Sequence, residues 1–592
     1  MLLQILTVVV GFYASVFEAE NPAYKSLPLA VQQKHIIVTC NYEARRRGLY
    51  KLQLITEAKR LCPDAVIVLG EDLTRFRNAS KTLYEYLRAF TWSDKAEKLG
   101  FDEVWLDITD IVNYNIEILN RNDLVNCFFQ LSRTDPTLGF SFDASTYAGS
   151  VFPVGADLSP LSLSLADQNL RLRLILGSHL AFHMRLQLEE HHGYTSTVGI
   201  STNKLISKLV GNLNKPKGQT TLVPPYESND NNESNVTMFL DTLDIGKVPG
   251  IGFKLAQKIR EYVLNRPAEF DAGLVYGGTK ENVTVGHVRQ SPEMSAELLD
   301  RILAGPGTPH GIGVKVLGLL NGVDNTEVSE ARNVPRQISI EDSYLRLDTM
   351  KELTEQLQSL SARLIDRMRI DLTETLDEPA KNGDKWKWLA HPPTLRLTTR
   401  PRLPLNEDGS RQRSFKRMSR SAPTPSFIFS QSDTVDAVAD RLVKESLLPL
   451  FRKLHPEKSG WNLSLVNVAV TGMEDEGKGG ASRHIGSMFK PAETGDASLN
   501  GSAQLDVTSP SSVNPSTLGS KETHSGAMDL GAIQNSDSTR QSLQESSENT
   551  QAELDAWDDP EDDIGGDDDR CTLCGVAIPE FARAAHERFH NT

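Results

Sequence analysis

The composition of the chain changes abruptly after Met473, and this break decides which parts can fold. From residue 474 to residue 556 Ser, Gly, Thr, Asn, Gln, Asp and Glu dominate, and aromatic residues nearly vanish. Such a stretch cannot bury enough apolar surface to offset the entropy of ordering it. We therefore predict a disordered acidic tail at residues 474–570 and place the folded domains before it.

The excess acidic charge lies in the same region. The chain has a net charge of −15, and residues 471–570 alone carry it, with 21 acidic and 6 basic residues. The other 492 residues hold 57 charges of each sign. The acidic balance therefore describes the tail and does not argue against nucleic-acid binding by the folded part.

The folded part shows two kinds of pattern. Apolar β-branched runs at residues 35–39 and 65–69 alternate with amphipathic helical patterns at 80–90 and 174–190, whereas residues 241–324 are helical throughout. Residues 335–473 mix both, with a helix predicted at 349–369 and a strand at 394–400. We expect a multidomain chain of the α/β and α+β classes. Five cysteines in 592 residues exclude a disulfide scaffold.

The N-terminus is the one candidate for a membrane or targeting segment. Its apolar run is about eleven residues, well short of the roughly 20 that span a bilayer. A signal peptide requires basic residues near its start, and this chain has no basic residue before Lys25. We therefore expect no membrane association.

Two adjacent carboxylates, Asp102 and Glu103, are the sharpest candidate site. Clustered carboxylate oxygens bind hard divalent cations such as Mg²⁺. Neighbouring side chains on a strand point to opposite faces, so both can reach one site only if the strand begins or turns there. Taken alone, an adjacent Asp-Glu pair is more often a solvated surface pair than a metal site, so the assignment needs support from other segments.

A basic segment, Thr39–Gly48, supplies possible phosphate ligands. A strand here runs into a turn and then a helix start that carries Arg45, Arg46 and Arg47. Guanidinium groups match phosphate oxygens in geometry. The alternative is a solvated basic helix face.

Together these segments resemble the Y-family DNA polymerases. The resemblance extends in order over about residues 11–470, which makes chance agreement negligible. Its segments are residues 11–16, 29–34, 39–45, 70–75, 100–103, 199–205, 215–220, 248–254 and 338–343.

The resemblance implies a hand-shaped polymerase with palm, fingers, helical thumb and little finger. The implied boundaries are fingers at 12–75, palm at 76–225, thumb at 226–330 and little finger at 335–473. It also implies translesion DNA synthesis in the nucleus, with primer-template DNA and dNTPs as substrates and two Mg²⁺ or Mn²⁺ ions.

The same resemblance assigns roles to single residues. Asp102 and Glu103 would bind the metals as catalytic carboxylates, and Tyr13 would be the steric gate against a ribose 2′-OH. The triphosphate contacts would be Tyr42, Arg45 and Lys215. The residues that border the new base pair would be Gln33, Lys34, Ile36 and Val38.

Two further patterns predict DNA contacts without the resemblance. Val248–Gly252, followed by a helix with Lys254, is similar to a helix-hairpin-helix, in which the turn at Gly250 and Gly252 offers backbone N–H groups to phosphate. Arg396, Arg400 and Arg402 could line one face along a DNA backbone. An ordinary turn and a solvated basic strand are the alternatives.

One departure from the family affects catalysis. The family's first palm motif carries a metal-bridging Asp just before the aromatic pair, and here that segment reads Val8-Val-Val10 before Gly11-Phe12-Tyr13. We interpret residues 1–11 as unrelated sequence, from a misassigned first exon or an alternative start, that replaces the first palm strand. The alternative function is therefore a non-catalytic scaffold that binds DNA and ubiquitin.

The C-terminus carries a metal-ligand pattern at residues 571–592. Cys571, Cys574, His586 and His590 have the spacing of a tetrahedral Zn²⁺ site. The cluster is similar to a ubiquitin-binding zinc finger, although Arg588 stands where that finger has an Asp. We expect zinc binding, and ubiquitin or a ubiquitinated sliding clamp as a possible partner.

Overall fold

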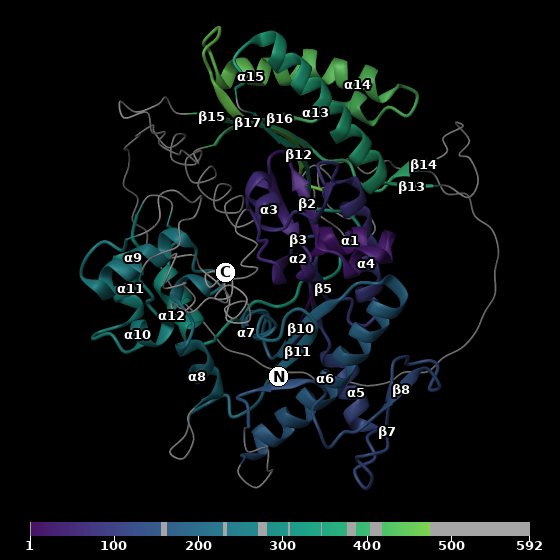
Figure 1. The fold of residues 1–592 in the computed structure, drawn as a ribbon, viewed down its shortest axis with the longest axis vertical. Helices are drawn as coiled ribbons and strands as arrows, with labels where there is room; N and C mark the ends of the chain where they lie inside the picture. The colour runs from purple at the N-terminus through teal and green to yellow at the C-terminus, as the bar shows by residue number, and fades with distance from the viewer. Residues whose placement is uncertain are drawn as a thin grey trace, which may run out of the picture. The chain divides into compact units, whose positions relative to one another are not determined.

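The computed structural model describes residues 2–155, 163–228, 234–269, 281–305, 308–344, 346–375, 386–402 and 417–473. Within these ranges the chain forms two compact units and passes from the first to the second between Ala331 and Arg332. Each unit combines helices and sheets (Figure 1), which confirms the predicted α/β and α+β classes. The predicted acidic tail and zinc finger lie outside the described residues. No helix in the described ranges has the length and apolar character that crossing a membrane requires.

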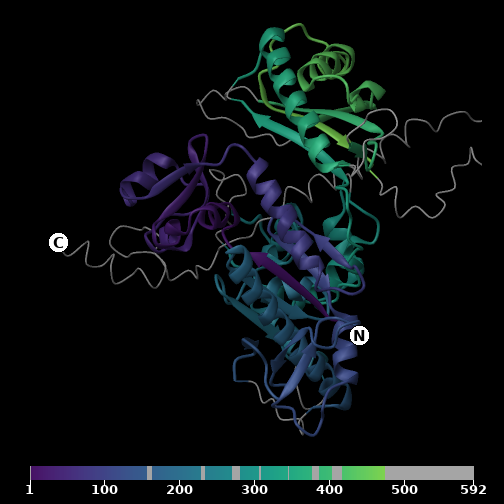
Figure 2. The ribbon, with the colours of Figure 1, turned by 90° about the vertical axis from the view of Figure 1, so that its right-hand side faces the viewer.

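A six-stranded sheet forms the centre of the first unit. β1 pairs antiparallel with β6 and with β10, while β11 runs parallel to β10 and to β9. The purple arrow of β1 lies among the blue elements of this unit in Figure 2. In spatial order the strands are β5 (Ala96–Lys98), β6 (Glu103–Asp107), β1 (Gln4–Val9), β10 (Ser196–Ser201), β11 (Gly218–Leu222) and β9 (Ser150–Phe152).

The position of β1 corrects the expectation that residues 1–11 replace the first strand of the sheet. All six residues of Gln4–Val9 are buried. Ile5 and Val9 belong to the main apolar core, whereas Leu6 and Val8 pack on the opposite face. A strand covered on both faces requires an uncharged, largely apolar run, and this segment supplies one. The expectation was wrong about the strand.

Helices cover both faces of this sheet. The long helix α6 (Leu165–His192) packs on β10 and β11, beside α5 (Thr109–Glu117), and α7 (Lys204–Val210) packs on β10 and β1. α6 begins where the Ser164 hydroxyl accepts a hydrogen bond from the Asp167 backbone, and it ends at Gly193, whose φ is 75°. α4 (Thr74–Arg88) contacts β6, and a hairpin of β7 (Cys127–Gln130) and β8 (Gly139–Phe142) completes this part.

A smaller sheet has its own apolar core, and its strand order is β3-β2-β4. The Asn41 side chain accepts hydrogen bonds from the Leu29 and Ala44 backbones and donates one to Glu18. It thereby joins the strands to the helices around them. These elements are α1 (Phe12–Glu20), β2 (Leu29–Gln33), β3 (Ile36–Cys40), α2 (Tyr42–Arg46), α3 (Ile55–Leu61) and β4 (Val66–Leu69).

The last part of the first unit is a cluster of short helices around one apolar core (Figure 1). Its helices are α8 (Asn235–Asp241), α9 (Phe253–Leu264), α10 (Val285–Arg289), α11 (Ala296–Leu303) and α12 (Ile312–Leu320).

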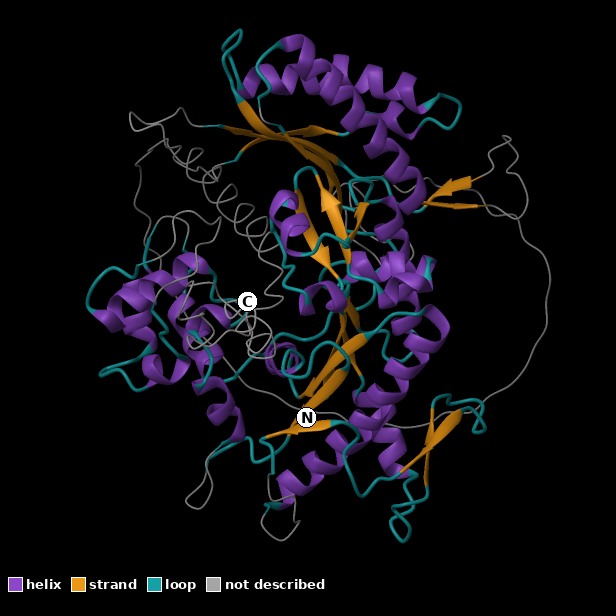
Figure 3. Cartoon of the chain, in the orientation of Figure 1, coloured by secondary structure: helices purple, strands orange, loops and turns teal. Residues whose placement is uncertain are grey.

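The second unit is a four-stranded antiparallel sheet with helices on one face (Figure 3). In spatial order the strands are β12 (Gln337–Ser343), β17 (Leu463–Thr471), β15 (Thr394–Pro401) and β16 (Met418–Pro423). The helices are α13 (Met350–Asp371), α14 (Val435–Leu442) and α15 (Leu448–Leu454). A separate hairpin consists of β13 (Thr373–Thr375) and β14 (Trp386–Trp388).

Candidate active site

Asp102 and Glu103 lie where β6 begins. The strand starts at Glu103, so Asp102 is in the preceding bend and is not bound by the alternation of side chains along the strand. The Asp102 carbonyl accepts a hydrogen bond of 3.0 Å from the Val9 backbone, which fixes the bend to the end of β1. The geometry therefore meets the condition under which two adjacent carboxylates can share a site.

Val8 is the residue of β1 directly opposite Glu103. Only 2% of Val8 is exposed, and it packs with Leu6, Trp105 and Val328. Directly opposed residues on antiparallel strands have Cβ atoms about 5 Å apart on the same face. A carboxylate at position 8 would therefore stand beside that of Glu103, and here a valine methyl takes its place.

Lys208, which the sequence reasoning missed, forms a buried ion pair with Glu103. Its ammonium donates a hydrogen bond of 3.0 Å to Glu103 Oε2, and the side chains of Lys208 and Glu103 are only 6% and 10% exposed. The ammonium also lies 5.8 Å from the centre of the Trp105 ring. Lys208 lies within the buried run Leu205–Val210 of α7, where a charged side chain needs a partner, but the sequence does not show that the partner is Glu103.

The chain holds two of the three carboxylates that the family motif implies. Asp102 and Glu103 are the carboxylates that would hold it, while the register position of the third carboxylate is Val8. Among the described residues no group of three His, Cys, Asp or Glu side chains could hold a metal ion. The predicted pair of ions therefore does not fit the residues present.

Tyr13 lies next to this strand start. Gly11, with φ at 62°, lies in the turn between β1 and α1, and this position favours glycine because its φ is left-handed. The Tyr13 ring stacks on Phe76 with centroids 4.2 Å apart, and it lies 6.1 Å from Phe101, which directly precedes Asp102. The structure thus brings the predicted steric gate close to the predicted metal ligands.

Tyr42 and Arg45 form one contact on α2. The Arg45 guanidinium lies 4.6 Å from the centre of the Tyr42 ring, and its Nε donates to the Cys40 carbonyl. Arg46 pairs with Glu43, and so does Arg47. Of the three arginines, Arg45 is thus the one held against the predicted triphosphate-binding tyrosine.

The remaining predicted nucleotide contacts lie on β2, on β3, in the turn between these strands, and before β11. Gln33 donates from Nε2 to the Gly70 carbonyl at 2.7 Å, and the backbone of Lys34, with φ at 51°, donates to Glu71 Oε1. Ile36 and Val38 lie half-buried on the same side of β3. Lys215 lies between α7 and β11, in the first unit with all of these residues.

The predicted helix-hairpin-helix turn has the expected backbone. Gly250 has φ at 88°, and Gly252 is the residue before α9, whose first turn carries Lys254. The buried side chains of Val248 and Ile251 fix the turn to the core of the helical cluster. The N–H groups of the first turn of α9 are the donors that a phosphate would use.

Of the three predicted arginines of the second unit, two lie on β15 and the third follows it. Leu395 and Leu397 are buried in the core, so Arg396 and Arg400 lie on the other face of β15. Arg402 follows the strand, and its guanidinium donates to the Tyr344 carbonyl. Two of the three side chains, Arg396 and Arg400, therefore lie on the same face of β15.

The predicted zinc ligands Cys571, Cys574, His586 and His590 lie outside the described residues.

Comparison with known proteins identifies the class. The impB/mucB/samB family matches residues 9–212, and the C-terminal domain of the same family matches residues 335–482, so that the two ranges take in more than half of the chain. The chain belongs to this family, that is, to the Y-family of DNA polymerases.

Within that family the chain is similar to DNA polymerase iota. It is 30% identical to the human protein over 465 residues, which cover 78% of this chain and 51% of the relative. Identity to the Drosophila melanogaster DNA polymerase iota is 27% over 485 residues, covering 81% of this chain and 55% of the relative. DNA polymerase eta of the same fly is 29% identical over 272 residues, covering 42% and 29%. The chain spans about half the length of the iota relatives.

Proposed function

We propose that the protein binds primer-template DNA and a dNTP and belongs functionally to the translesion DNA polymerases. In that reaction the primer 3′-OH attacks the α-phosphate of the dNTP and pyrophosphate leaves. The observation that carries the proposal is the pair Asp102 and Glu103 at the start of β6, with Tyr13 beside it. A bound divalent cation would supply positive charge to the phosphate oxygens there.

The other side chains would bind and orient the substrates. Tyr42, Arg45 and Lys215 would hold the triphosphate, and Tyr13 would exclude a ribose 2′-OH by its bulk. Gly250, Gly252 and Lys254 would contact the DNA backbone, as would Arg396 and Arg400 on β15. Positioning of the primer end and the dNTP would then contribute most of the rate enhancement, because the protein makes no covalent bond with the substrate.

A second candidate function is a non-catalytic DNA-binding protein. Two observations favour it: Val8 replaces a carboxylate opposite Glu103, and Lys208 neutralises Glu103 from within the fold. Both would weaken cation binding without affecting the DNA contacts. We therefore expect slow or undetectable primer extension by the natural chain.

The two functions separate in one pair of measurements on the whole chain. We expect the natural chain, Asp102→Ala and Asp102→Asn to bind labelled primer-template DNA with equal affinity. Any extension in the presence of Mg²⁺ or Mn²⁺ should vanish in both variants. Extension that survives Asp102→Ala would contradict the assignment of Asp102, and no DNA binding by the natural chain would contradict both functions.

Three further proposals concern the setting. We propose that the protein acts in the nucleus, because the animal proteins to which it is similar are named as DNA polymerases. Residues 571–592 would bind one Zn²⁺ through Cys571, Cys574, His586 and His590. That segment would contact ubiquitin or a ubiquitinated sliding clamp, weakly because Arg588 offers no hydrogen-bond acceptor.

A further inference from the structure

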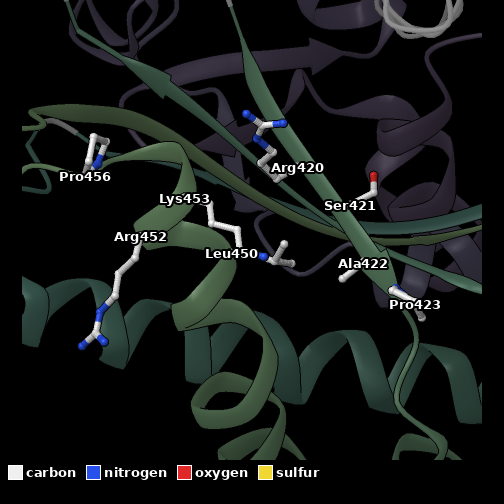
Figure 4. A pocket seen from close by; sticks show the side chains of 8 residues that line it. All are labelled: Arg420, Ser421, Ala422, Pro423, Leu450, Arg452, Lys453 and Pro456. Atoms are coloured by element: carbon white, nitrogen blue, oxygen red, sulfur yellow. The ribbon is translucent and has the colours of Figure 1, made fainter. Parts of the chain in front are cut away.

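A basic cleft lies in the second unit between β16 and α15. It has a volume of about 700 Å³. Figure 4 shows Arg420 and Arg452 on opposite sides of the cleft, with Lys453 between them. Its apolar wall consists of Ala422, Pro423, Leu450 and Pro456.

The three cations of the cleft have no counter-charge in the described part of the chain. The side chains of Arg420, Arg452 and Lys453 are exposed and form no ion pair or hydrogen bond with another described residue. Glu457, which follows Pro456, is the acidic residue nearest in sequence, and it does not line the cleft. Three like charges around an apolar floor favour an anionic partner with an apolar anchor.

The cleft is separate from the face of the sheet proposed to contact DNA. In the register of β15 and β16, Arg420 stands opposite the buried Leu397 and Ala422 opposite the buried Leu395. Paired residues share a face, so these two belong to the face that carries the helices. Arg396 and Arg400 belong to the other face.

We propose that this cleft binds the acidic segment 553–569 of the same chain. That segment holds ten acidic residues and no basic one, with Trp557 among them. The indole would lie against Leu450 and Pro456, where a cation can also stack on it, and the carboxylates would face Arg420 and Arg452. The 84 residues from Met473 to Trp557 can span up to roughly 280 Å, so chain length does not prevent the contact.

This docking has a consequence for the C-terminal segment. Cys571 follows the acidic segment almost directly, so docking would hold residues 571–592 beside the second unit. It would also keep the acidic charge off the face of Arg396 and Arg400. Primer-template DNA and the acidic segment would then bind at the same time.

Carbodiimide cross-linking of the full chain at low salt tests the proposal, because this reagent joins a lysine amine to a carboxylate in direct contact. We expect mass spectrometry to find Lys453 joined to carboxylates of residues 553–569, within single chains, with or without primer-template DNA. The Arg420→Glu/Arg452→Glu variant keeps the reporting amine of Lys453 and should lose the cross-link by about tenfold, since each surface charge contributes up to about one factor of five.

The matched control is Lys351→Glu/Lys444→Glu, which reverses two exposed charges outside the lining and should leave the cross-link unchanged. An unaltered unfolding midpoint in both variants shows that the fold is intact. The proposal is overturned if Lys453 is not joined to residues 553–569, or if Lys351 and Lys444 are joined to them equally well. Loss of the cross-link on adding DNA would assign the cleft to nucleic acid, and cross-links only between two chains would assign it to a second copy.

Discussion

Lys208 changes the electrostatics of the candidate active site, because it pairs with Glu103 inside the protein. Its ammonium and the Glu103 carboxylate are both withdrawn from water, and each compensates the other. The pair joins residues 105 positions apart in the chain, so no local pattern could have indicated it. The Lys208 ammonium thus supplies a positive charge beside Glu103 from within the fold.

We predict that Lys208→Met destabilises the first unit by about 3–5 kcal/mol, because it leaves a buried carboxylate without a partner. Urea unfolding of the whole chain measures the loss. Adding Glu103→Gln to the same chain should recover part of it. The control is Lys204→Met, whose partner Glu97 is 25% exposed and which should cost less. Equal losses for both lysines would show that the Glu103 pair is not special.

His455 gives the second unit a pH dependence. Burial lowers the pKa of His455, and Glu457 raises it to a smaller extent. The ring shares a hydrogen bond of 2.9 Å with the Thr399 hydroxyl and lies near the rings of Phe451 and Trp461. Since the folded pKa is below the ordinary value near 6.5, the unfolded chain binds the proton more readily.

We therefore predict that the contribution of His455 to the stability of the second unit is fully present above pH 6.5 and is lost as the pH drops below this value. Urea midpoints between pH 5 and pH 8 measure the slope. His455→Gln should flatten the slope, whereas His391→Gln, at an exposed position, should leave it unchanged. A slope that survives His455→Gln would assign the effect to other groups.

The two glycines of the turn before α9, Gly250 and Gly252, have different backbone conformations. Gly250 has φ at 88°, and a Cβ there would meet Leu319 at 3.0 Å, whereas Gly252 has φ at −69°. We predict that Gly250→Ala costs about 1–2 kcal/mol, because the left-handed conformation is strained for alanine. It should also weaken primer-template binding, which fluorescence anisotropy measures. Gly252→Ala should change both quantities little, and equal effects would contradict this account of the turn.

Helices and strands with a strong periodic pattern could be predicted from the sequence, and β1 shows where such reasoning failed. α13 and β15 lie within two residues of the predicted ranges because their apolar residues repeat at the period of one element. Residues 4–9 have the apolar character of a buried strand, and the absence of the Asp does not remove the strand itself. The strand forms because its apolar side chains are buried, whereas the carboxylate would serve to bind metal. The strand is present in this chain, and the carboxylate is absent.

At the scale of the whole molecule, the family motifs mark single candidate residues, and the structure shows which of these residues lie close together. The structure places Tyr13 near Phe101, which precedes Asp102 and the start of β6 at Glu103, and it places Arg45 against the ring of Tyr42. It separates Arg402 from Arg396 and Arg400. The basic cleft could not be predicted, because Arg420 and Lys453 approach each other only through the packing of α15 on β16.

We propose that this chain has the first strand of the sheet and lacks the metal-binding carboxylate that the family motif places on it. The direct measurement is primer extension by the whole chain with Val8→Asp, compared with Val8→Asn, which has the same shape without the charge. We predict that Val8→Asp extends primers in Mg²⁺ faster than the natural chain and that Val8→Asn does not, with equal DNA affinity for all three. Fast extension by the natural chain, or no gain from Val8→Asp in a folded protein, would contradict the account.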